Sequence, residues 1–267
     1  MIHNHRMLRV VPFAAAVLLA LAVAGPARGA SPTTAVARSG MGGSTYVAGA
    51  GLPDGIDVSH WQGFIRWHKV AAAGVDFAIA KATDGTWMVD PRYARNEARA
   101  EANGIFFTAY HYARPTTATN DAVKEADFFV KNANLTGDNL VPALDIETSG
   151  GLDRHQLRGW VLSWLDEVDQ KLGVKPMIYT SPSFWAYYLG NTQIVARRGY
   201  QVVWVAHWGV YKPRVPAKDW NKNGWTYWQW TSQSHVAGIY GHVDRDWFHG
   251  DDLTALTIGS MRAQSPD

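Results

Sequence analysis

Residues 141–173 read VPALDIETSGGLDRHQLRGWVLSWLDEVDQKLG, and this stretch decides the fold class. An apolar run opens it over residues 141–147 and predicts a buried strand. Asp153 then provides a helix N-cap, Gln156 completes a capping box, and Gly173 supplies the stop. An apolar stripe at helical spacing lies between these signals: Leu157, Trp160, Val161, Trp164, Leu165, Val168 and Leu172. The stretch therefore predicts a strand, a loop and a helix.

The same alternation continues through residues 53–258. Further strands are expected at residues 55–59, 77–82, 106–111, 177–180, 202–206, 226–230 and 243–247. Further helices are expected at about residues 92–103 and 120–133, and the helical pattern fades after residues 183–189. Strands that alternate with helices predict βα units around a parallel sheet. We therefore expect an α/β fold, a single-domain TIM-like (βα)5β3 barrel whose last third is irregular.

The residues before the barrel predict an export signal. Arg6 and Arg9 precede an apolar run over residues 10–24, and small residues follow it. The run has about 15 residues, fewer than the ~20 that a bilayer span needs, so a retained membrane anchor is the weaker alternative. The expected divisions are a signal peptide at 1–30, a flexible leader at 31–52, the barrel at 53–258 and a C-terminal tail at 259–267. We expect a secreted, extracellular monomer that is free of the membrane once the signal is removed.

Composition excludes several classes of function. From residue 53 onward, 21 Lys and Arg stand against 23 Asp and Glu, so no basic patch points to nucleic acid. The chain has no Cys, which excludes thiol nucleophiles and Cys-based zinc sites. Its barrel histidines lack the spacing of metal ligands on one element, and His111 is expected to face the barrel wall. We therefore expect no metal and no cofactor.

Polar side chains recur at the ends of the expected strands. In a βα barrel the working residues lie at the carboxyl ends of the strands. Polar groups within apolar strands cost free energy unless they are paired or used. The candidates are Asp57, Lys81, Tyr110, Tyr112, Asp145, Glu147, Tyr179, His207, Gln229 and Asp244. We expect these side chains to form one site.

Two of these carboxylates, Asp145 and Glu147, suggest the chemistry. Residues two apart on a strand share a face, so both side chains should point the same way. Two nearby carboxylates repel, which raises the pKa of one and keeps a proton donor available near neutral pH. Glycoside hydrolysis needs such an acid and a second carboxylate. For this tripeptide alone, a strand end that happens to carry two acids is an equally good interpretation.

Four further blocks surround the tripeptide. They are DVSHWQG at 57–63, AYHYARP at 109–115, WQWTS at 228–232 and GHVDRDWF at 241–248. In this order they closely resemble the lysozymes of glycoside hydrolase family 25, the Chalaropsis-type N-acetylmuramidases, over residues 53–258. The resemblance implies a flattened barrel that hydrolyses the β-1,4 bond from N-acetylmuramic acid to N-acetylglucosamine, with peptidoglycan glycan strands as the partner.

The resemblance also implies residue roles. Glu147 matches the catalytic acid, and Asp145 matches the neighbour that sets its ionisation and positions the substrate's acetamido group. Asp57 and Asp244 match two further catalytic aspartates. One departure is Asp246, where the resemblance leads us to expect Asn. This residue adds a negative charge near the site or a neighbouring loop.

Aromatic residues fit a sugar substrate. All 13 Trp lie beyond residue 53, and flat rings cover the apolar faces of pyranoses. Core packing is the preferred interpretation for Trp160, Trp164 and Trp204. The expected substrate-binding residues are Tyr110, Tyr112, Tyr179, Lys81, Trp228, Gln229 and His207.

Two other functions stay open. A metal-dependent phosphodiester hydrolase could use Asp57, Asp145, Glu147 and Asp244 as ligands. A non-catalytic glycan-binding barrel is the second alternative, and the presence of Glu147 argues against it. The choice between retention and inversion depends on the separation of the carboxylates, which the sequence does not give.

Overall fold

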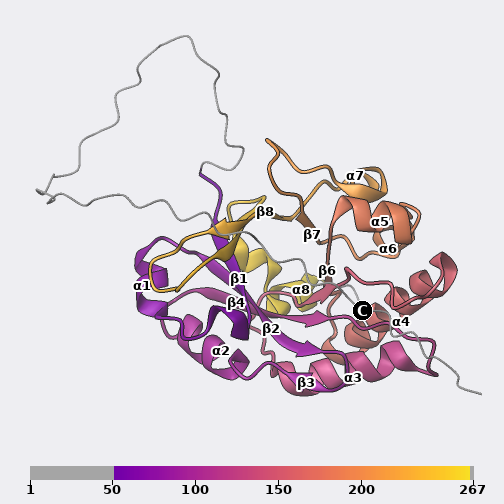
Figure 1. The fold of residues 1–267 in the computed structure, drawn as a ribbon, viewed down its shortest axis with the longest axis horizontal. Helices are drawn as coiled ribbons and strands as arrows, with labels where there is room; N and C mark the ends of the chain where they lie inside the picture. The colour runs from indigo at the N-terminus through magenta and orange to yellow at the C-terminus, as the bar shows by residue number, and fades with distance from the viewer. Residues whose placement is uncertain (1–50, 265–267) are drawn as a thin grey trace, which may run out of the picture. The chain divides into compact units, whose positions relative to one another are not determined.

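One sheet of nine strands forms the centre of the computed structural model, which describes residues 51–264 (Figure 1). The expected signal peptide, the leader up to residue 50 and residues 265–267 lie outside the described residues. The strands are β1 (Asp54–Val58), β2 (Phe77–Asp84), β3 (Met88–Val89), β4 (Phe106–Tyr112), β5 (Ala143–Asp145), β6 (Met177–Thr180), β7 (Val203–Ala206), β8 (Tyr227–Ser234) and β9 (Val243–Phe248).

The sheet closes on itself, because β1 pairs with both β2 and β9. The neighbours β1, β2 and β4 to β8 are parallel, whereas β9 runs antiparallel to β8 and to β1. The short strand β3 was not expected and forms a hairpin with β2. The predicted (βα)5β3 barrel is confirmed. Because β9 is antiparallel, its beginning lies at the edge where the parallel strands end.

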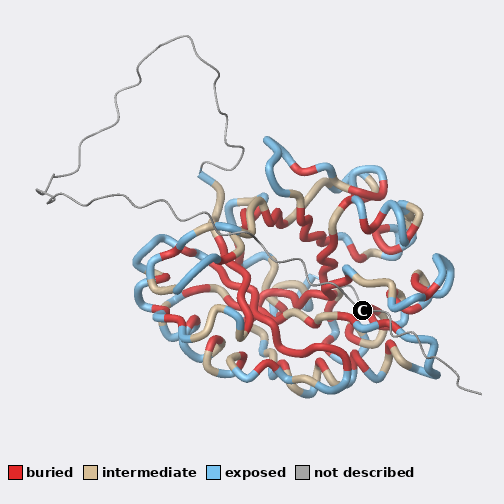
Figure 2. The backbone as a smooth tube through the Cα atoms, in the orientation of Figure 1, coloured by how far each residue is buried: buried red, intermediate tan, exposed pale blue. Residues whose placement is uncertain are grey.

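Helices cover the outside of this barrel. They are α1 (Trp67–Ala72), α2 (Tyr93–Glu101), α3 (Asp121–Ala133), α4 (Arg154–Leu172), α5 (Pro182–Tyr188), α6 (Ile194–Arg197), α7 (Pro216–Lys222) and α8 (Ile258–Gln264), with 3-10 turns η1 (His60–Gln62) and η2 (Leu253–Leu256). Buried residues are concentrated in the strands, and exposed residues in the surrounding helices and loops (Figure 2). Within residues 51–264, no helix combines the length and apolar character needed to cross a bilayer.

Helix α4 follows its sequence signals closely. The Asp153 carboxylate accepts from the backbone N–H groups of His155 and Gln156, each at 2.8 Å, and the Gln156 side chain accepts from the Asp153 N–H at 3.0 Å. Gly173 ends the helix with a φ of 60°, a left-handed conformation that glycine adopts without a Cβ penalty. All seven residues of the expected apolar stripe are buried. The strand before α4 ends at Asp145, two residues earlier than expected.

His111 lies between the sheet and the helices, as predicted. Its Nε2 is 2.8 Å from Glu125 Oε2 on α3, and its Nδ1 is 2.8 Å from Thr83 Oγ1 on β2. The ring stacks on Trp164 of α4 with centroids 5.5 Å apart. His111 therefore ties two helices to the barrel wall.

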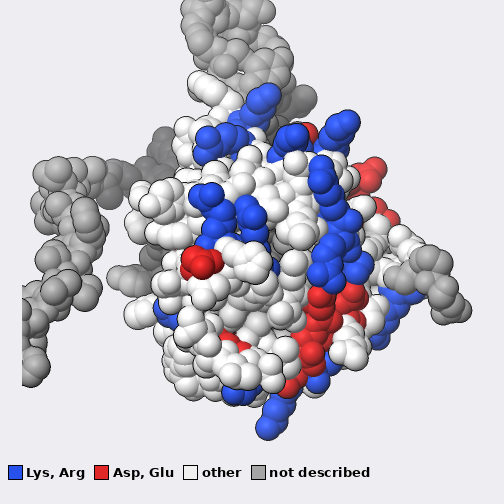
Figure 3. Space-filling view, turned by 90° about the vertical axis from the view of Figure 1, so that its right-hand side faces the viewer, with Lys and Arg blue, Asp and Glu red and all other residues white. Residues whose placement is uncertain are grey.

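Helices α5, α6 and α7 gather on one side of the barrel (Figure 1). We call these helices, with residues 207–215, the α5–α7 lobe. Trp185 and Trp220 join α5 to α7 through rings 5.0 Å apart, and both indoles are buried. Figure 3 shows Lys and Arg gathered on the upper part of the face that carries this lobe, with Asp and Glu concentrated below. A basic surface therefore exists that the nearly balanced charge of the barrel did not lead us to expect.

Candidate active site

Carboxylates converge where β1, β5 and β9 meet the carboxyl edge of the barrel. Asp57 lies directly opposite Asp244 in the pairing of β1 with β9. Asp145 ends β5, and Glu147 follows in the first loop residues after that strand. Asp57 and Asp145 are buried, Asp244 is half-buried and Glu147 is exposed. The charges of Asp244 and Asp145 raise the pKa of Asp57, and the charge of Glu147 raises the pKa of both Asp145 and Asp244, so the structure brings the four expected catalytic residues near one another.

Asp57 is held by the Gln229 side chain. The Gln229 amide nitrogen donates to Asp57 Oδ2 at 2.7 Å. The Gln229 oxygen accepts from the Tyr179 hydroxyl and from Trp208 Nε1, both at 3.0 Å. With two donors on its oxygen, the amide can present only its nitrogen to Asp57. Burial, followed by the charges of Asp244 and Asp246, raises the pKa of Asp57 well above its usual range, while the Gln229 hydrogen bond opposes this.

Asp145 and Glu147 lie two residues apart, and the charge of Glu147 acts on Asp145. Burial and then the charge of Glu147 raise the pKa of Asp145 well above its usual range. Asp145 Oδ1 is buried and has no hydrogen-bond partner among the described residues. The protein packed around Glu147 raises the pKa of its carboxyl, whereas Tyr112, Lys81 and Arg114 lower it. The expected cause was repulsion from Asp145, but that repulsion acts chiefly on Asp145, the more deeply buried member.

Lys81 and Arg114 meet at Asp84, a residue that the sequence reasoning missed. Lys81 Nζ donates to Asp84 Oδ2 at 2.8 Å, and Arg114 Nε donates to Oδ1 at 2.6 Å. Both cations lie over the Tyr112 ring, at 4.5 Å and 4.4 Å from its centroid. Burial alone would raise the pKa of Asp84, but hydrogen bonds from Arg114 and Lys81 hold it below its usual value. The cations nearest Glu147 are therefore already paired.

Asp246 occupies the barrel interior behind Asp57. It is fully buried, and Trp204 Nε1 donates to its Oδ1 at 2.7 Å. Its Oδ2 has no hydrogen-bond partner of normal geometry, although it lies near enough to Asp57 for the two groups to influence each other. Burial, assisted by the charge of Asp244, raises the pKa of Asp246 to about 8. This raised pKa favours the protonated form of Asp246 towards neutral pH, which opposes the negative charge expected from the sequence. Trp204, expected only as a core residue, is both buried and a donor to this group.

The remaining expected binding residues divide into two groups. Tyr110 and Tyr179 pack against Trp204 inside the barrel, with centroids at 6.3 Å and 4.3 Å. Trp228 neighbours Gln229 on β8 and is 1% exposed, packed against Trp247 with its Nε1 donating to the His207 carbonyl at 2.8 Å. Successive side chains on a strand point to opposite faces. Trp228 therefore lies on the face of β8 opposite to the carboxylates.

His207 follows β7 and braces a loop. Its Nδ1 accepts from the Arg214 N–H at 2.9 Å, which makes the other ring nitrogen the protonated one in the neutral ring. Burial, followed by the charge of Arg214, lowers the pKa of His207. No hydrogen bond joins its side chain to the carboxylates of the described barrel.

Exposed indoles on the loops after β1 and β2 were not among the expected site residues. Trp61 is 81% exposed and Trp87 is 66% exposed. The Arg114 guanidinium lies 6.0 Å from the Trp87 centroid, so this ring stands beside the Lys81 and Arg114 cluster. The sequence signal that could have identified Trp61 and Trp87 is their position shortly after expected strands.

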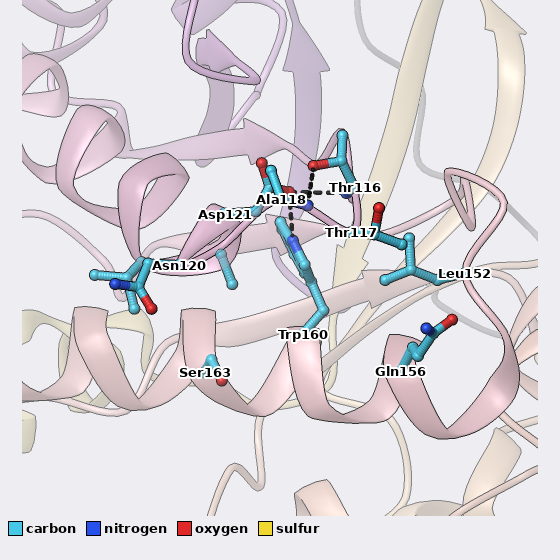
Figure 4. Close-up of a pocket in the computed structure, with 11 residues that line it drawn as sticks. Thr116, Thr117, Ala118, Asn120, Asp121, Leu152, Gln156, Trp160 and Ser163 are labelled. Atoms are coloured by element: carbon cyan, nitrogen blue, oxygen red, sulfur yellow. Dashed lines mark hydrogen bonds between the residues drawn. The ribbon is translucent and has the colours of Figure 1, made fainter.

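A separate pocket of about 330 Å³ lies between the loop after β4 and the start of α4 (Figure 4). Asp121 is the acid in its lining. The Thr116 N–H and the Trp160 Nε1–H both donate to Asp121 Oδ2, at 2.8 Å each. Because this carboxylate is already satisfied, we assign the pocket no chemistry. Across residues 51–264, no group of three or more His, Cys, Asp or Glu side chains is arranged to hold a metal ion.

Comparison with known proteins places this geometry among related chains. The model of Glycosyl hydrolases family 25 matches residues 56–239. Lysozyme M1 of Streptomyces globisporus is 38% identical over 218 residues, which cover 78% of this chain and 72% of that protein. The solved bacterial lysozyme from Streptomyces coelicolor superposes with a TM-score of 0.71 at 36% identity, covering 78% of this chain and 97% of the other. The muramidase from Trichobolus zukalii gives 0.69 at 29% identity, covering 77% and 99%.

Proposed function

Because the chain belongs to family 25 of the glycosyl hydrolases, we infer that it is a lysozyme that hydrolyses the β-1,4 bond between N-acetylmuramic acid and N-acetylglucosamine in peptidoglycan. The observation that carries the assignment of the site is that Asp145 and Glu147, both with a raised pKa, lie together at the carboxyl edge of the barrel. Asp57 and Asp244 face this pair from β1 and β9.

Glu147 is the acid in this proposal. Its exposed position makes it accessible to a glycosidic oxygen, and its raised pKa keeps a proton available nearer to neutral pH. As the bond breaks, that proton moves to the oxygen of the departing N-acetylglucosamine, and positive charge develops on the sugar left behind. The Tyr112 hydroxyl orients the Glu147 carboxyl through the hydrogen bond that also lowers its pKa.

The three aspartates position the substrate and stabilise the charge that develops during the reaction. Asp145 Oδ1 is an unpaired buried acceptor, and the acetamido N–H of the substrate is a donor of the right kind for it. Asp57 and Asp244 supply the second carboxylate that must meet the developing positive charge or the attacking water. Gln229 and Tyr179 act through Asp57, whose orientation they fix.

Sugar contacts in this proposal come from rings beside the acid. Tyr112 lies half-buried under Lys81 and Arg114, and Tyr110 is half-buried on the same face of β4. Trp228 and His207 support the floor beneath Gln229 and the loop after β7, so their substitution is expected to act on stability more than on substrate affinity.

The decisive experiment is digestion of purified peptidoglycan followed by reduction and identification of the new sugar ends. New reducing ends on muramic acid are expected. New ends on glucosamine would replace the assignment with a glucosaminidase, and release of phosphate esters would favour the phosphodiester hydrolase. Glu147→Gln serves as the control, because it preserves size while removing the transferable proton.

We also propose that the chain is exported and acts outside the cell as a monomer. The support is the basic start at Arg6 and Arg9 and the apolar run that follows. Intact-mass analysis of the secreted protein should show cleavage between about residues 25 and 31. A secreted species that still begins at Met1 would contradict this.

A further inference from the structure

The α5–α7 lobe carries a concentrated positive charge. Between residues 197 and 222 the sequence has six Lys and Arg and one acid, Asp219, although acids slightly outnumber bases over the whole barrel. All six basic residues are exposed: Arg197, Arg198, Lys212, Arg214, Lys218 and Lys222. This is the region over which basic side chains gather in Figure 3. The lobe therefore presents a local field opposite in sign to the rest of the barrel.

Four of these cations have neither an ion pair nor a side-chain hydrogen bond within residues 51–264. Arg198 forms an ion pair with Asp166 at 2.9 Å, and Arg197 donates to Gln193. The side chains of Lys212, Arg214, Lys218 and Lys222 form no ion pair within the described part of the chain. Their charge is consequently available to an external anion. Lys81 and Arg114 at the active site differ, because each forms an ion pair with Asp84.

The surface is built on a fixed frame that starts at the active site. Trp208, at the beginning of the loop after β7, donates to Gln229, the residue that holds Asp57. The contact from the Arg214 N–H to His207 closes this loop. Trp220 on α7 is fully buried and donates to the Tyr200 carbonyl at 2.9 Å. The loop that carries Lys212 and Arg214 therefore starts at the residue that contacts Gln229, and α7 is held by its buried Trp220.

The sugars of the glycan strand offer no anion to this surface. The peptide stems also carry carboxylates, at isolated points where each muramic acid of the strand bears one stem. At the sugar bound beside Glu147, the nearest cations, Lys81 and Arg114, already share Asp84 as their ion-pair partner. Unpaired cations spread over a loop and a helix match a repeating anion instead, as when Lys and Arg neutralise successive phosphates of a polymer.

We propose that the α5–α7 lobe binds an anionic phosphodiester polymer of the cell wall and thereby retains the enzyme beside the strand that it cuts. The proposal rests on the peptidoglycan-hydrolase function above. The polymer contributes no group to the reaction, and its effect is to raise the local concentration of enzyme at an insoluble substrate.

The test compares two variants that lose the same number of charges. Lobe variant K212Q/R214Q/K218Q/K222Q removes the four unpaired cations. Control variant K69Q/R99Q/K124Q/K131Q removes four exposed cations from α1, α2 and α3, none of which forms an ion pair within the described residues. Each set is also placed in the Glu147→Gln background, so that binding can be measured by sedimentation without digestion.

Binding is measured on walls that carry the phosphodiester polymer and on the same walls after hydrofluoric acid has removed it. On polymer-bearing walls, the lobe variant should bind about tenfold more weakly than wild type at low salt, and its slope of log K against log salt should be smaller by roughly 3. The control variant should bind like wild type. On stripped walls, all three proteins should bind equally.

Equal losses by the lobe variant on both kinds of wall would overturn the proposal and assign the surface to the peptide stems. Equal behaviour of the lobe and control variants on polymer-bearing walls would overturn it as well. Turnover of soluble glycan by wild type and lobe variant should match, because no substituted residue belongs to the active site. If wild type itself does not hydrolyse soluble glycan, the enzymatic function is refuted, whereas the result of the binding comparison still stands.

Discussion

Replacing Asp246 by Asn should stabilise the folded protein at neutral pH. Asp246 is fully buried, and its pKa rises from 3.8 to about 8 on folding. Between these values the folded state keeps a proton that the unfolded chain releases, so stability falls as pH rises from about 4 to about 8. From the unfolded-state pKa to pH 7 the interval is about 3 pH units, and each unit lowers the free energy of unfolding by ~1.4 kcal/mol. The stability that wild type loses by pH 7 is therefore roughly 4 kcal/mol as an upper limit. Asn has no proton to lose and can still accept from Trp204.

The assay is urea unfolding of wild type and Asp246→Asn across pH 4 to pH 8.5. The two proteins should be similar at pH 4, and the variant should be increasingly more stable as pH rises. Asp138→Asn changes an exposed acid and is the control, whose pH dependence should follow wild type. An Asp246→Asn protein that is less stable than wild type at pH 7, or that retains the full pH slope, would refute the assignment of a buried proton to Asp246.

The remaining predictions concern activity. Glu147→Gln should lower turnover at least ~10²-fold with wall binding largely kept, and a variant that retains more than about a tenth of wild-type turnover excludes Glu147 as the acid. Asp57→Asn, Asp145→Asn and Asp244→Asn should each lose much activity while circular dichroism shows a folded barrel; wild-type turnover in any of them removes that residue from the site. Wall cleavage should be unaffected by a chelator or a reducing agent, and a loss restored by one divalent ion would instead favour metal-dependent phosphodiester hydrolysis.

Local signals allowed most of the barrel to be predicted from the sequence. Helix α4 has its cap, stripe and stop within about 20 residues, so nothing distant is needed to define it. The exact ends of the strands were harder to predict from the sequence. The apolar run continues to Ile146, but the ladder ends at Asp145 because neighbouring strands determine where pairing stops. Met88 and Val89 are too few to produce a period, and β3 was therefore missed.

The candidate site was predictable where it depended on strand position and unpredictable where it depended on distances across the barrel. The carboxylates could be found from their places at strand ends. The protonation of Asp246 depends on Trp204, 42 residues away, and on complete burial. Trp228 and Gln229 are adjacent on a strand, so alternation alone would already have separated their side chains onto opposite faces.

Closure of the barrel between its first and last strands has a consequence for the timing of activity. Gln229 binds Asp57 across 172 residues of sequence, and Asp244 faces Asp57 from a strand made later still. A nascent chain that ends before β8 contains Asp57 but neither Gln229 nor Asp244. Contacts of such sequence separation also form late in folding. The active site is therefore complete only after β9 has been synthesised and has paired with β1. The order of synthesis itself thus delays hydrolytic activity.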